Sequence, residues 1–466
     1  MSLPRNVVNA ALCALLFASP AFAQSAPSEG DAAAQPAVAQ PASSSEESAP
    51  PAEPDTAEEA PASTEPSGEP AGKAKGRQQN SSSKGDFLDP AAGSLSLGGE
   101  EGFGIGTAIG DPTALYGPDR TEPVLNGTVR SSTINVSSFY SVKPADNQRV
   151  LFELNFDPAF VGADISYSIQ PKGWDGLFTV NGWMSSARFA PFEESFDKVF
   201  LPNYENPYLQ QGGLGVEYMT HITKNFDLAA AINYQNYAFS DSLFGGDRFP
   251  VDVTNQLLTL NRRNPGEVYS LNLHGIYSTM DDRRLPTEGY KVRFAAEQGV
   301  AMGNNSSSYT RLATNLTGMF VTNNNEDYKN NLLLNLQAGT ILGTAPNVRS
   351  FHMGGAFSVR GYNPGEMASG TSFLQATAEY RHHLTDFTVF DTDIELRGAA
   401  FVDYGSVLGT MRNVRGIPEY LYEKPTNGTG YGVGLHFATD YGLFRIETAW
   451  NNRGENNIFL AVGERF

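Results

Sequence analysis

Apolar and polar residues alternate with a period of two along most of the chain after its hundredth residue. In the stretch 371–384, for example, one set of alternate positions carries Leu374 and Tyr380, and the other carries Glu379 and Arg381. Successive side chains of a strand point to opposite faces, so each such stretch has one apolar face and one polar face. This pattern is typical of strands that face lipid on the outside of a barrel and a wet lumen on the inside.

The alternating stretches predict about sixteen strands, an even number as in single-chain bacterial outer-membrane barrels. The expected ranges are 126–140, 149–156, 162–170, 175–189, 210–221, 225–240, 252–263, 266–280, 288–301, 307–322, 329–343, 371–384, 391–406, 427–439, 442–451 and 456–466. The longest interruptions, 190–209, 344–370 and 407–426, are expected to be loops. We therefore predict an all-β fold, a transmembrane antiparallel β-barrel whose closure leaves no free sheet edge.

The composition agrees with a barrel and argues against other classes of protein. The chain has 20 Tyr, 29 Phe and 47 Gly, which favours many short strands with tight turns. Its formal net charge of −19 argues against a nucleic-acid partner, because nucleic-acid binding needs a basic face. No segment approaches the ~20 apolar residues that a transmembrane helix needs.

The N-terminal segment, residues 1–23, has the pattern of a secretory signal peptide. Arg5 precedes an apolar run too short to span a bilayer, and Ala21-Phe22-Ala23 provides a cleavage site of the A-x-A type. The segment contains the only cysteine, Cys13, so we expect a mature chain without disulfides or thiol chemistry.

Residues 24–100 are predicted to form a disordered acidic linker. They are rich in Ala, Pro, Ser and Glu, and from residue 24 to residue 86 the only large aliphatic side chain is Val38. Such a segment cannot bury enough apolar surface to offset the entropy lost on ordering. The barrel is expected over residues 101–466, with Gly102–Gly106 as a flexible lead-in.

The loop 344–370 places an arginine inside the predicted barrel, within the string Val359-Arg360-Gly361-Tyr362. An unpaired guanidinium in a confined lumen would be costly, whereas a bidentate pair with a carboxylate would hold the loop in one geometry. About forty residues further on, Asp403 in the string Phe401-Val402-Asp403-Tyr404-Gly405 is a candidate partner. Gly361 would allow close passage along the wall or a positive φ, and Tyr362 would pack while its hydroxyl finds a partner.

Three motifs occur in the order found in an outer-membrane superfamily. They are Asp281-Asp282-Arg283-Arg284-Leu285-Pro286-Thr287-Glu288-Gly289, Gly354-Gly355-Ala356-Phe357-Ser358-Val359-Arg360-Gly361-Tyr362, and Phe401-Val402-Asp403-Tyr404-Gly405. They resemble, in turn, a D-x-R-x-x-P-T-x-G turn, a G-G-x-x-S-V-R-G-Y loop and an F-x-D-x-G strand end. The chain is thus similar to the superfamily of BamA-like assembly factors and TpsB barrels of two-partner secretion, the hemolysin-secretion and bacterial surface antigen type.

This resemblance implies roles for several residues. The V-R-G-Y loop would fold back into the lumen, where Arg360 pairs with Asp403, and Glu379 on the polar face of the preceding strand is a second candidate acceptor. Gly432 and Gly434 would leave one face bare to make room for the loop. The turn motif is carried by Asp282, Arg283, Pro286, Thr287 and Gly289. The terminal Phe466 would serve as the signal for barrel assembly, although Glu464 stands where an apolar residue is usual.

The resemblance also implies a function. We expect a barrel in the bacterial outer membrane that inserts or translocates polypeptide clients among its lipids. Residues 24–100 lack the apolar residues for the periplasmic POTRA domains of the family. The tail would therefore enter the lumen as a plug, recruit a separate periplasmic receptor, or do neither. The main alternative function is a passive pore for small solutes, and a third is a surface or scaffolding barrel whose acidic tail is the working part.

Catalytic chemistry is not indicated. The chain has no G-x-S-x-G, H-E-x-x-H or P-loop motif. Of its 6 histidines, the adjacent His382 and His383 would point to opposite faces of a strand. We predict no enzyme activity, no cofactor and no metal.

Overall fold

The structure is a computed structural model that describes residues 95–97, 102–107, 136–157, 160–188, 208–240, 242–245, 247–248, 266–282, 285–302, 306–324, 328–390, 392–408, 414–415, 424–439, 442–462 and 464–465. All of these belong to the second of two compact units, which covers residues 79–466. The expected signal peptide, nearly all of the expected linker, Arg283 and Phe466 lie outside the described residues.

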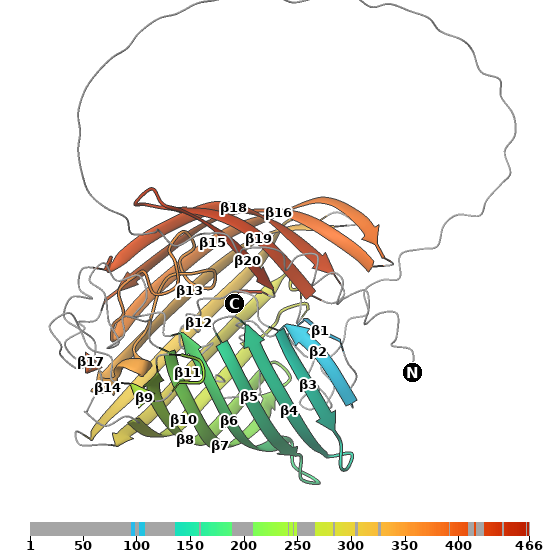
Figure 1. The fold of residues 1–466 in the computed structure, drawn as a ribbon. Helices are drawn as coiled ribbons and strands as arrows, with labels where there is room; N and C mark the ends of the chain where they lie inside the picture. The colour runs from blue at the N-terminus through green and yellow to red at the C-terminus, as the bar shows by residue number, and fades with distance from the viewer. Residues whose placement is uncertain are drawn as a thin grey trace, which may run out of the picture. The chain divides into compact units, whose positions relative to one another are not determined.

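An antiparallel sheet of 18 strands dominates the described part of the chain (Figure 1). Without the short β1 and β9, sixteen strands remain. The strands are β1 (Leu95–Leu97), β2 (Gly102–Thr107), β3 (Val136–Val142), β4 (Gln148–Asp157), β5 (Phe160–Ile169), β6 (Gly176–Arg188), β7 (Tyr208–Thr223), β8 (Phe226–Ser240), β9 (Asp247–Arg248), β10 (Gly266–Ser278), β11 (Gly289–Met302), β12 (Ser307–Asn324), β13 (Lys329–Gly343), β15 (Ser372–Val389), β16 (Thr392–Val407), β18 (Asn427–Thr439), β19 (Gly442–Asn451) and β20 (Asn456–Val462). A second small sheet pairs β14 (Ala345–Pro346) with β17 (Val414–Arg415) in parallel.

Each long strand pairs with the next one along the chain. The ladders continue from β2–β3 to β19–β20, and β8 pairs directly with β10. The ends of the sheet are therefore the β1–β2 pair and β20. Among the described residues, no ladder joins β20 to β1 or β2.

The strands carry polar side chains inward and apolar side chains outward, the reverse of a soluble protein. On β16, Asp403 is buried while its neighbours Val402 and Tyr404 are 44% and 42% exposed. The same alternation places Leu334 and Leu336 outside and Asn335 inside on β13. A polar lumen within an apolar outer surface is the arrangement of a transmembrane β-barrel. The predicted fold class and the approximate strand number are confirmed.

The first part of the sheet and one later strand differ from the predicted ranges. Because β8 pairs directly with β10, the expected strand 252–263 has no place between them, and that stretch lies outside the described residues. Its leucines give it the pattern of a strand. Membership of the sheet, however, depends on which strands pair, and the sequence of one segment does not show that. Every other predicted range overlaps one described strand.

The sequence analysis also missed β2, a strand of six residues. Residues 102–106, expected as a flexible lead-in, pair with β3, and Leu95–Leu97 of the expected linker pair with β2 as β1. The sheet thus begins before the predicted boundary at residue 101. Alternating glycines give β2 few side chains to pack, so its strand character is weak in the sequence.

The connections differ in length at the two ends of the barrel. At the end where β20 finishes, which we call the short-turn end, the links include 224–225, 390–391 and 440–441. At the opposite end, the loop end, they include 189–207, 344–371 and 408–426. Outer-membrane barrels have short turns toward the periplasm and long loops outside.

The described residues contain no helix that is long and apolar enough to cross a membrane. The 3-10 turn η3 (Asn347–Arg349) lies in the longest described loop. That loop, residues 344–370, connects β13 to β15 and is called the lumen loop below.

Candidate functional site

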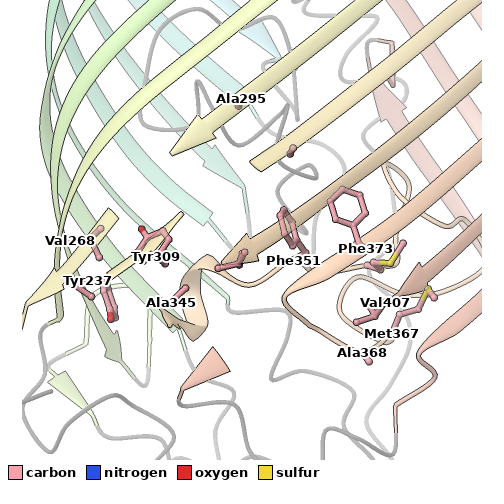
Figure 2. Close-up of a cluster of buried hydrophobic side chains, with 14 of the residues drawn as sticks. Tyr237, Val268, Ala295, Tyr309, Ala345, Phe351, Met367, Ala368, Phe373 and Val407 are labelled. Carbon is pink, nitrogen blue, oxygen red and sulfur yellow. The ribbon is translucent and has the colours of Figure 1, made fainter. Parts of the chain in front are cut away.

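The lumen loop has a tightly packed apolar part. Its side chains Phe351, Met353, Val359, Tyr362 and Met367 have no measurable exposure. They form one cluster with side chains of the surrounding strands, among them Tyr309, Phe373 and Val407. Figure 2 shows Phe351 and Phe373 close together, with Met367 and Ala368 near Val407. The loop is therefore a packed plug, held by apolar contacts within a mostly polar barrel interior.

The lumen loop also holds itself in shape. Phe351 and Gly370 form a two-way backbone bridge, with N···O distances of 2.9 and 3.0 Å. Within the loop, the Gly355 N–H donates to the Tyr362 carbonyl at 2.8 Å. These bonds close the loop at its base and again around its tip, so the residues between Gly355 and Tyr362 form a compact turn.

Arg360 lies at this turn and is bound by three carboxylates. Its Nε donates to Oδ2 of Asp403 at 2.7 Å, and its Nη2 donates to Oδ1 at 3.0 Å, which is a bidentate pair. Its backbone N–H also donates to Oδ2 at 3.1 Å. Nη1 donates to Oε2 of Glu379 at 2.7 Å and to Oε1 of Glu447 at 3.0 Å. None of these four side chains is more than 1% exposed.

The Phe401 ring covers the remaining face of the guanidinium, with the Arg360 Cζ 3.2 Å from the ring centroid. An aromatic face attracts a cation, and a planar guanidinium stacks on it well. Burial disfavours the charged form of Arg360, but Asp403, Glu447 and Glu379 outweigh that effect and hold its pKa above the usual value. Arg360 is therefore a permanently charged anchor.

A wider charged network surrounds this anchor. Glu379 also accepts from Arg381 at 2.8 Å, Glu447 from His436 at 3.0 Å, and Asp403 from Thr377 at 2.9 Å. Counted together, four arginines and four carboxylates are joined by ion pairs: Arg360, Arg381, Arg445 and Arg465 with Glu379, Asp403, Glu447 and Glu464. The members come from the lumen loop, β15, β16, β19 and the chain after β20. We call this set the charged lock.

The wall opposite the lumen loop is shaped to admit its backbone. A Cβ added to Gly430 of β18 would lie 1.6 Å from the Arg360 carbonyl oxygen, so only glycine fits there. Gly361 has φ of +96°, and a Cβ on it would meet the Trp450 backbone at 2.8 Å. The Gly361 carbonyl accepts from the side-chain amides of Asn451 and Asn457 at 3.0 and 2.9 Å. The loop is thus hydrogen-bonded to the wall as well as ion-paired.

The predicted glycines Gly432 and Gly434 lie beside the lock but do not receive the loop backbone. An added Cβ would meet the Phe401 ring at 2.6 Å in the first case and Cγ of Glu447 at 2.8 Å in the second. The glycines that adjoin the loop are Gly430 and Gly428, where an added Cβ would meet the Tyr362 ring. The strand does offer a bare face to the loop, but at Gly430 and Gly428, two and four positions before Gly432.

The turn motif also closes on itself, with Asp281 at its centre rather than the predicted Asp282. Asp281 accepts from the backbone N–H groups of Thr287 and Glu288 at 2.8 and 2.9 Å and from the Thr287 hydroxyl. Asp282 accepts from the Leu285 N–H at 2.9 Å. Burial raises the pKa of Asp281, but hydrogen bonds from Thr287 and Glu288 outweigh it, so the net pKa is below the usual value.

The remaining residues of the turn motif complete the bend. Pro286 is buried, and Gly289 has φ of +121°, a conformation that favours glycine. Leu285 is 3% exposed and forms an apolar cluster with Ala438 and Leu443. Those two residues belong to β18 and β19, so the turn folds over the short-turn end of the lumen.

The sequence analysis did not assign five members of the charged lock, namely Arg381, Arg445, Glu447, Glu464 and Arg465. Glu447 and Arg445 lie on the polar face of β19, which the alternation identified without assigning a partner. Glu464 stood out as a polar residue near the chain end, and Arg465 carried no signal at all. The predicted Val359, Arg360, Gly361, Tyr362, Glu379, Phe401 and Asp403 all lie within the lock or directly beside it.

The described residues contain no group of three or more His, Cys, Asp or Glu side chains placed to hold a metal ion. The carboxylates of the lock are already bound to arginines. The arrangement can hold a segment of chain in one position by charge, but it presents no nucleophile and base to a substrate.

Comparison with known proteins gives one family. A model of the Omp85 superfamily domain matches residues 147–466. Over 184 residues the chain is 32% identical to the chloroplastic protein TOC75-4 of Arabidopsis thaliana, covering 38% of this chain and 43% of that protein. Over 131 residues it is 34% identical to the chloroplastic outer envelope protein 39 of Arabidopsis thaliana, covering 28% and 34%. The chain thus spans less than half the length of these relatives.

The fold also resembles that of a solved structure. BamA from Haemophilus ducreyi lacking POTRA domains 1–3 matches with a TM-score of 0.53 and 12% identity, over 70% of this chain and 66% of that one.

Proposed function

The chain belongs to the Omp85 superfamily, and from that premise we propose that it inserts polypeptides into an outer membrane or moves them across it. Barrels of this superfamily sit in outer membranes, and its members transport or insert proteins. The narrower assignment, to a bacterial outer membrane, is proposed from the signal-peptide pattern of residues 1–23 and the short turns of the barrel.

One observation supports the proposal more than any other: the lumen loop is anchored through Arg360 to Asp403, Glu379 and Glu447. A buried arginine with three carboxylate partners holds well while all are present, and separating them leaves uncompensated charge in a confined space. Such an anchor has two positions, engaged and released. A passive pore would need neither a plug of this size nor an anchor for it.

The proposed mechanism is physical and uses no bond chemistry. While the lock is engaged, the lumen loop stays bound to the barrel wall inside the lumen. An arriving client strand supplies backbone hydrogen bonds to the ends of the sheet, the β1–β2 pair and β20, and offsets the cost of releasing the loop. Folding of the client beyond the membrane then gives direction without ATP.

We propose partners for the outer face, the lumen and the sheet ends of the barrel. Outer-membrane lipids would contact the apolar outer face, where Leu214, Ile232 and Leu271 are more than half exposed. A polypeptide client would use the lumen or the sheet ends. We further propose that residues 24–100 form an acidic linker, with a separate periplasmic receptor as one candidate partner, and that the protein is not an enzyme.

Replacement of Arg360 tests the proposal. Arg360→Ala should leave the amount of folded barrel in the membrane nearly unchanged and strongly reduce export or insertion of the client. Arg360→Lys should fail to restore activity, because one ammonium cannot reproduce a bidentate pair and reach two more carboxylates. Arg397→Ala is the matched control, since Arg397 is a buried lumen arginine on β16 that pairs with Glu395 of its own strand.

If the Arg360→Ala variant exports or inserts its client normally, at a normal amount of folded barrel, the lock is not needed for the function. Steady, open conductance that ignores Arg360 would favour the passive pore instead.

A further inference from the structure

The end of the chain reaches the charged lock. β20 finishes at Val462, and the side chains of Glu464 and Arg465 lie among the lock residues. The Arg465 side chain has no measurable exposure, and that of Glu464 is 11% exposed. Two charged residues at a chain end are thus placed inside the barrel, where burial of charge requires partners.

Arg465 binds both the lumen loop and a carboxylate of the barrel wall. Its Nη1 donates to Oδ1 of Asp403 at 3.1 Å, the oxygen that also accepts from Arg360. Its Nη2 donates to the Ser358 carbonyl, two residues before Arg360 in the lumen loop. One guanidinium therefore touches the loop backbone and the carboxylate that anchors the loop.

Glu464 reaches Arg360 through two intermediates. Its Oε1 and Oε2 accept from Nη1 and Nη2 of Arg381 at 2.7 and 2.8 Å, a second bidentate pair. Arg381 in turn donates to Glu379, which accepts from Arg360. Glu464 is therefore linked to Arg360 through Arg381 and Glu379, and Arg465 is linked to it through Asp403.

The chain end supplies individual ion pairs to this arrangement and leaves its net charge unchanged. Of the four arginines and four carboxylates of the lock, one of each comes from the chain end. If both leave, Arg381 loses its bidentate partner and the loop loses the bond at Ser358. β20 is also an end of the sheet, paired among the described residues only with β19. It is therefore among the strands held by the fewest ladder bonds.

We propose that Glu464 and Arg465 are positioning residues that couple β20 to the lumen loop, so that displacement of β20 and release of Arg360 occur as one event. The inference rests on the proposed function, because it concerns how the lock of a polypeptide-conducting barrel is released. It identifies the last strand as the element through which a client strand would signal to the plug.

A double-mutant cycle in planar bilayers tests the coupling. Opening frequency of the purified full-length protein is measured for the wild type, Arg360→Gln, Arg465→Gln and the double variant. Arg465→Gln alone should raise the frequency about tenfold, within the range for residues that share a partner. The double variant should open no more often than Arg360→Gln alone, since both changes release the same loop. Arg397→Gln is the control and should behave as the wild type.

The same cycle can overturn the proposal. If Arg465→Gln behaves like Arg397→Gln, or if the two changes multiply in the double variant, Arg465 does not act through the loop. Heat-modifiable gel migration checks that each barrel is folded. If Arg465→Gln does not assemble, Arg465→Lys replaces it. Lysine keeps the charge but cannot bind Asp403 with a rigid fork, so an intermediate opening frequency is expected, and a wild-type frequency would contradict the coupling.

The two proposals fail differently. Loss of client export in Arg360→Ala together with an unchanged Arg465→Gln would remove the coupling and leave the proposed function standing. If the Arg360→Gln barrel opens no more often than the wild type, Arg360 does not hold the channel closed, and both the lock and the coupling are contradicted.

Discussion

Arg360 can be buried because its donors are distributed over three carboxylates, with one aromatic ring covering its plane. Loss of one partner from a buried ion pair typically costs about 3–5 kcal/mol, since a charge is left without compensation. Most of the partners of Arg360 can be identified only when the pairing of the strands is known. The motifs predicted Arg360 with Asp403, and alternation predicted that Glu379 faces inward. Glu447 and Arg465 are 87 and 105 positions from Arg360, and nothing local in the sequence links them to it.

Gly430 provides a sharp test of how closely the loop lies against the wall. Gly430→Ala places a Cβ 1.6 Å from the Arg360 carbonyl oxygen, so the loop must move or the strand must bend. We expect normal barrel assembly with a raised opening frequency in bilayers. Gly398→Ala on the neighbouring β16 is the control, because its nearest contact would be Leu384 at an ordinary 3.4 Å. Equal behaviour of the two variants would mean that the loop does not pack against β18.

The turn 279–288 is the second element that folds over the lumen, and its shape depends on one carboxylate. Hydrogen bonds from Thr287 and Glu288 hold the pKa of Asp281 below its usual value. The folded state therefore favours the ionised form, and this contribution to stability is present at neutral pH. It is lost as the pH falls below about 4, through the folded pKa.

Hydrogen exchange can follow this titration. After correction for intrinsic rates, the Thr287 and Glu288 amides should be protected at pH 6 and lose protection as the pH falls through the lowered pKa of Asp281. In Asp281→Asn the two amides should be less protected at pH 6 and vary little with pH. Equal protection of the wild type and the variant at pH 6 would contradict the assignment of Asp281 as the centre of the turn.

Leu285 tests whether the turn closes on the opposite wall. Its cluster with Ala438 and Leu443 joins β10–β11 to β18–β19 across the short-turn end. Removal of a buried leucine side chain costs about 2–5 kcal/mol, so Leu285→Ala should free the turn and speed trypsin cleavage at Arg283 and Arg284. Ile222→Ala is the control, since Ile222 is apolar, lies near a turn at the same end and is 53% exposed. An unchanged cleavage rate would place the turn outside the lumen.

The alternating pattern was sufficient to predict most strands. It was insufficient where membership of the sheet depends on strand pairing. From β4 to β8 and from β10 to β20 the predicted ranges overlap the described strands, because each carries a lipid face and a lumen face. The glycine-rich β2 carries too few side chains for alternation to identify it. The stretch 252–263 shows alternation without a place in the sheet. Closure of the two sheet ends on each other was expected from general barrel geometry and has no ladder among the described residues.

The barrel as a whole contains two kinds of interior. Near the loop end, the lumen loop packs on apolar side chains such as Phe373 and Val407. Deeper inside, charged side chains from the loop, β15, β16, β19 and the chain end form one balanced set. Apolar packing gives the plug its shape, and the charges give it a position that can be lost cooperatively. This combination is what the proposed function requires, namely a channel that stays closed until a client arrives.

The most direct test of that account is quantitative mass spectrometry of outer-membrane and secreted proteins, with the gene deleted and then restored. The account predicts that one or a few specific proteins disappear from those fractions on deletion and return on restoration. Restoration with the Arg360→Ala form should fail to bring them back. An unchanged proteome in the deletion strain, accompanied by slower uptake of small solutes, would contradict a role in moving polypeptides and identify the barrel as a passive pore.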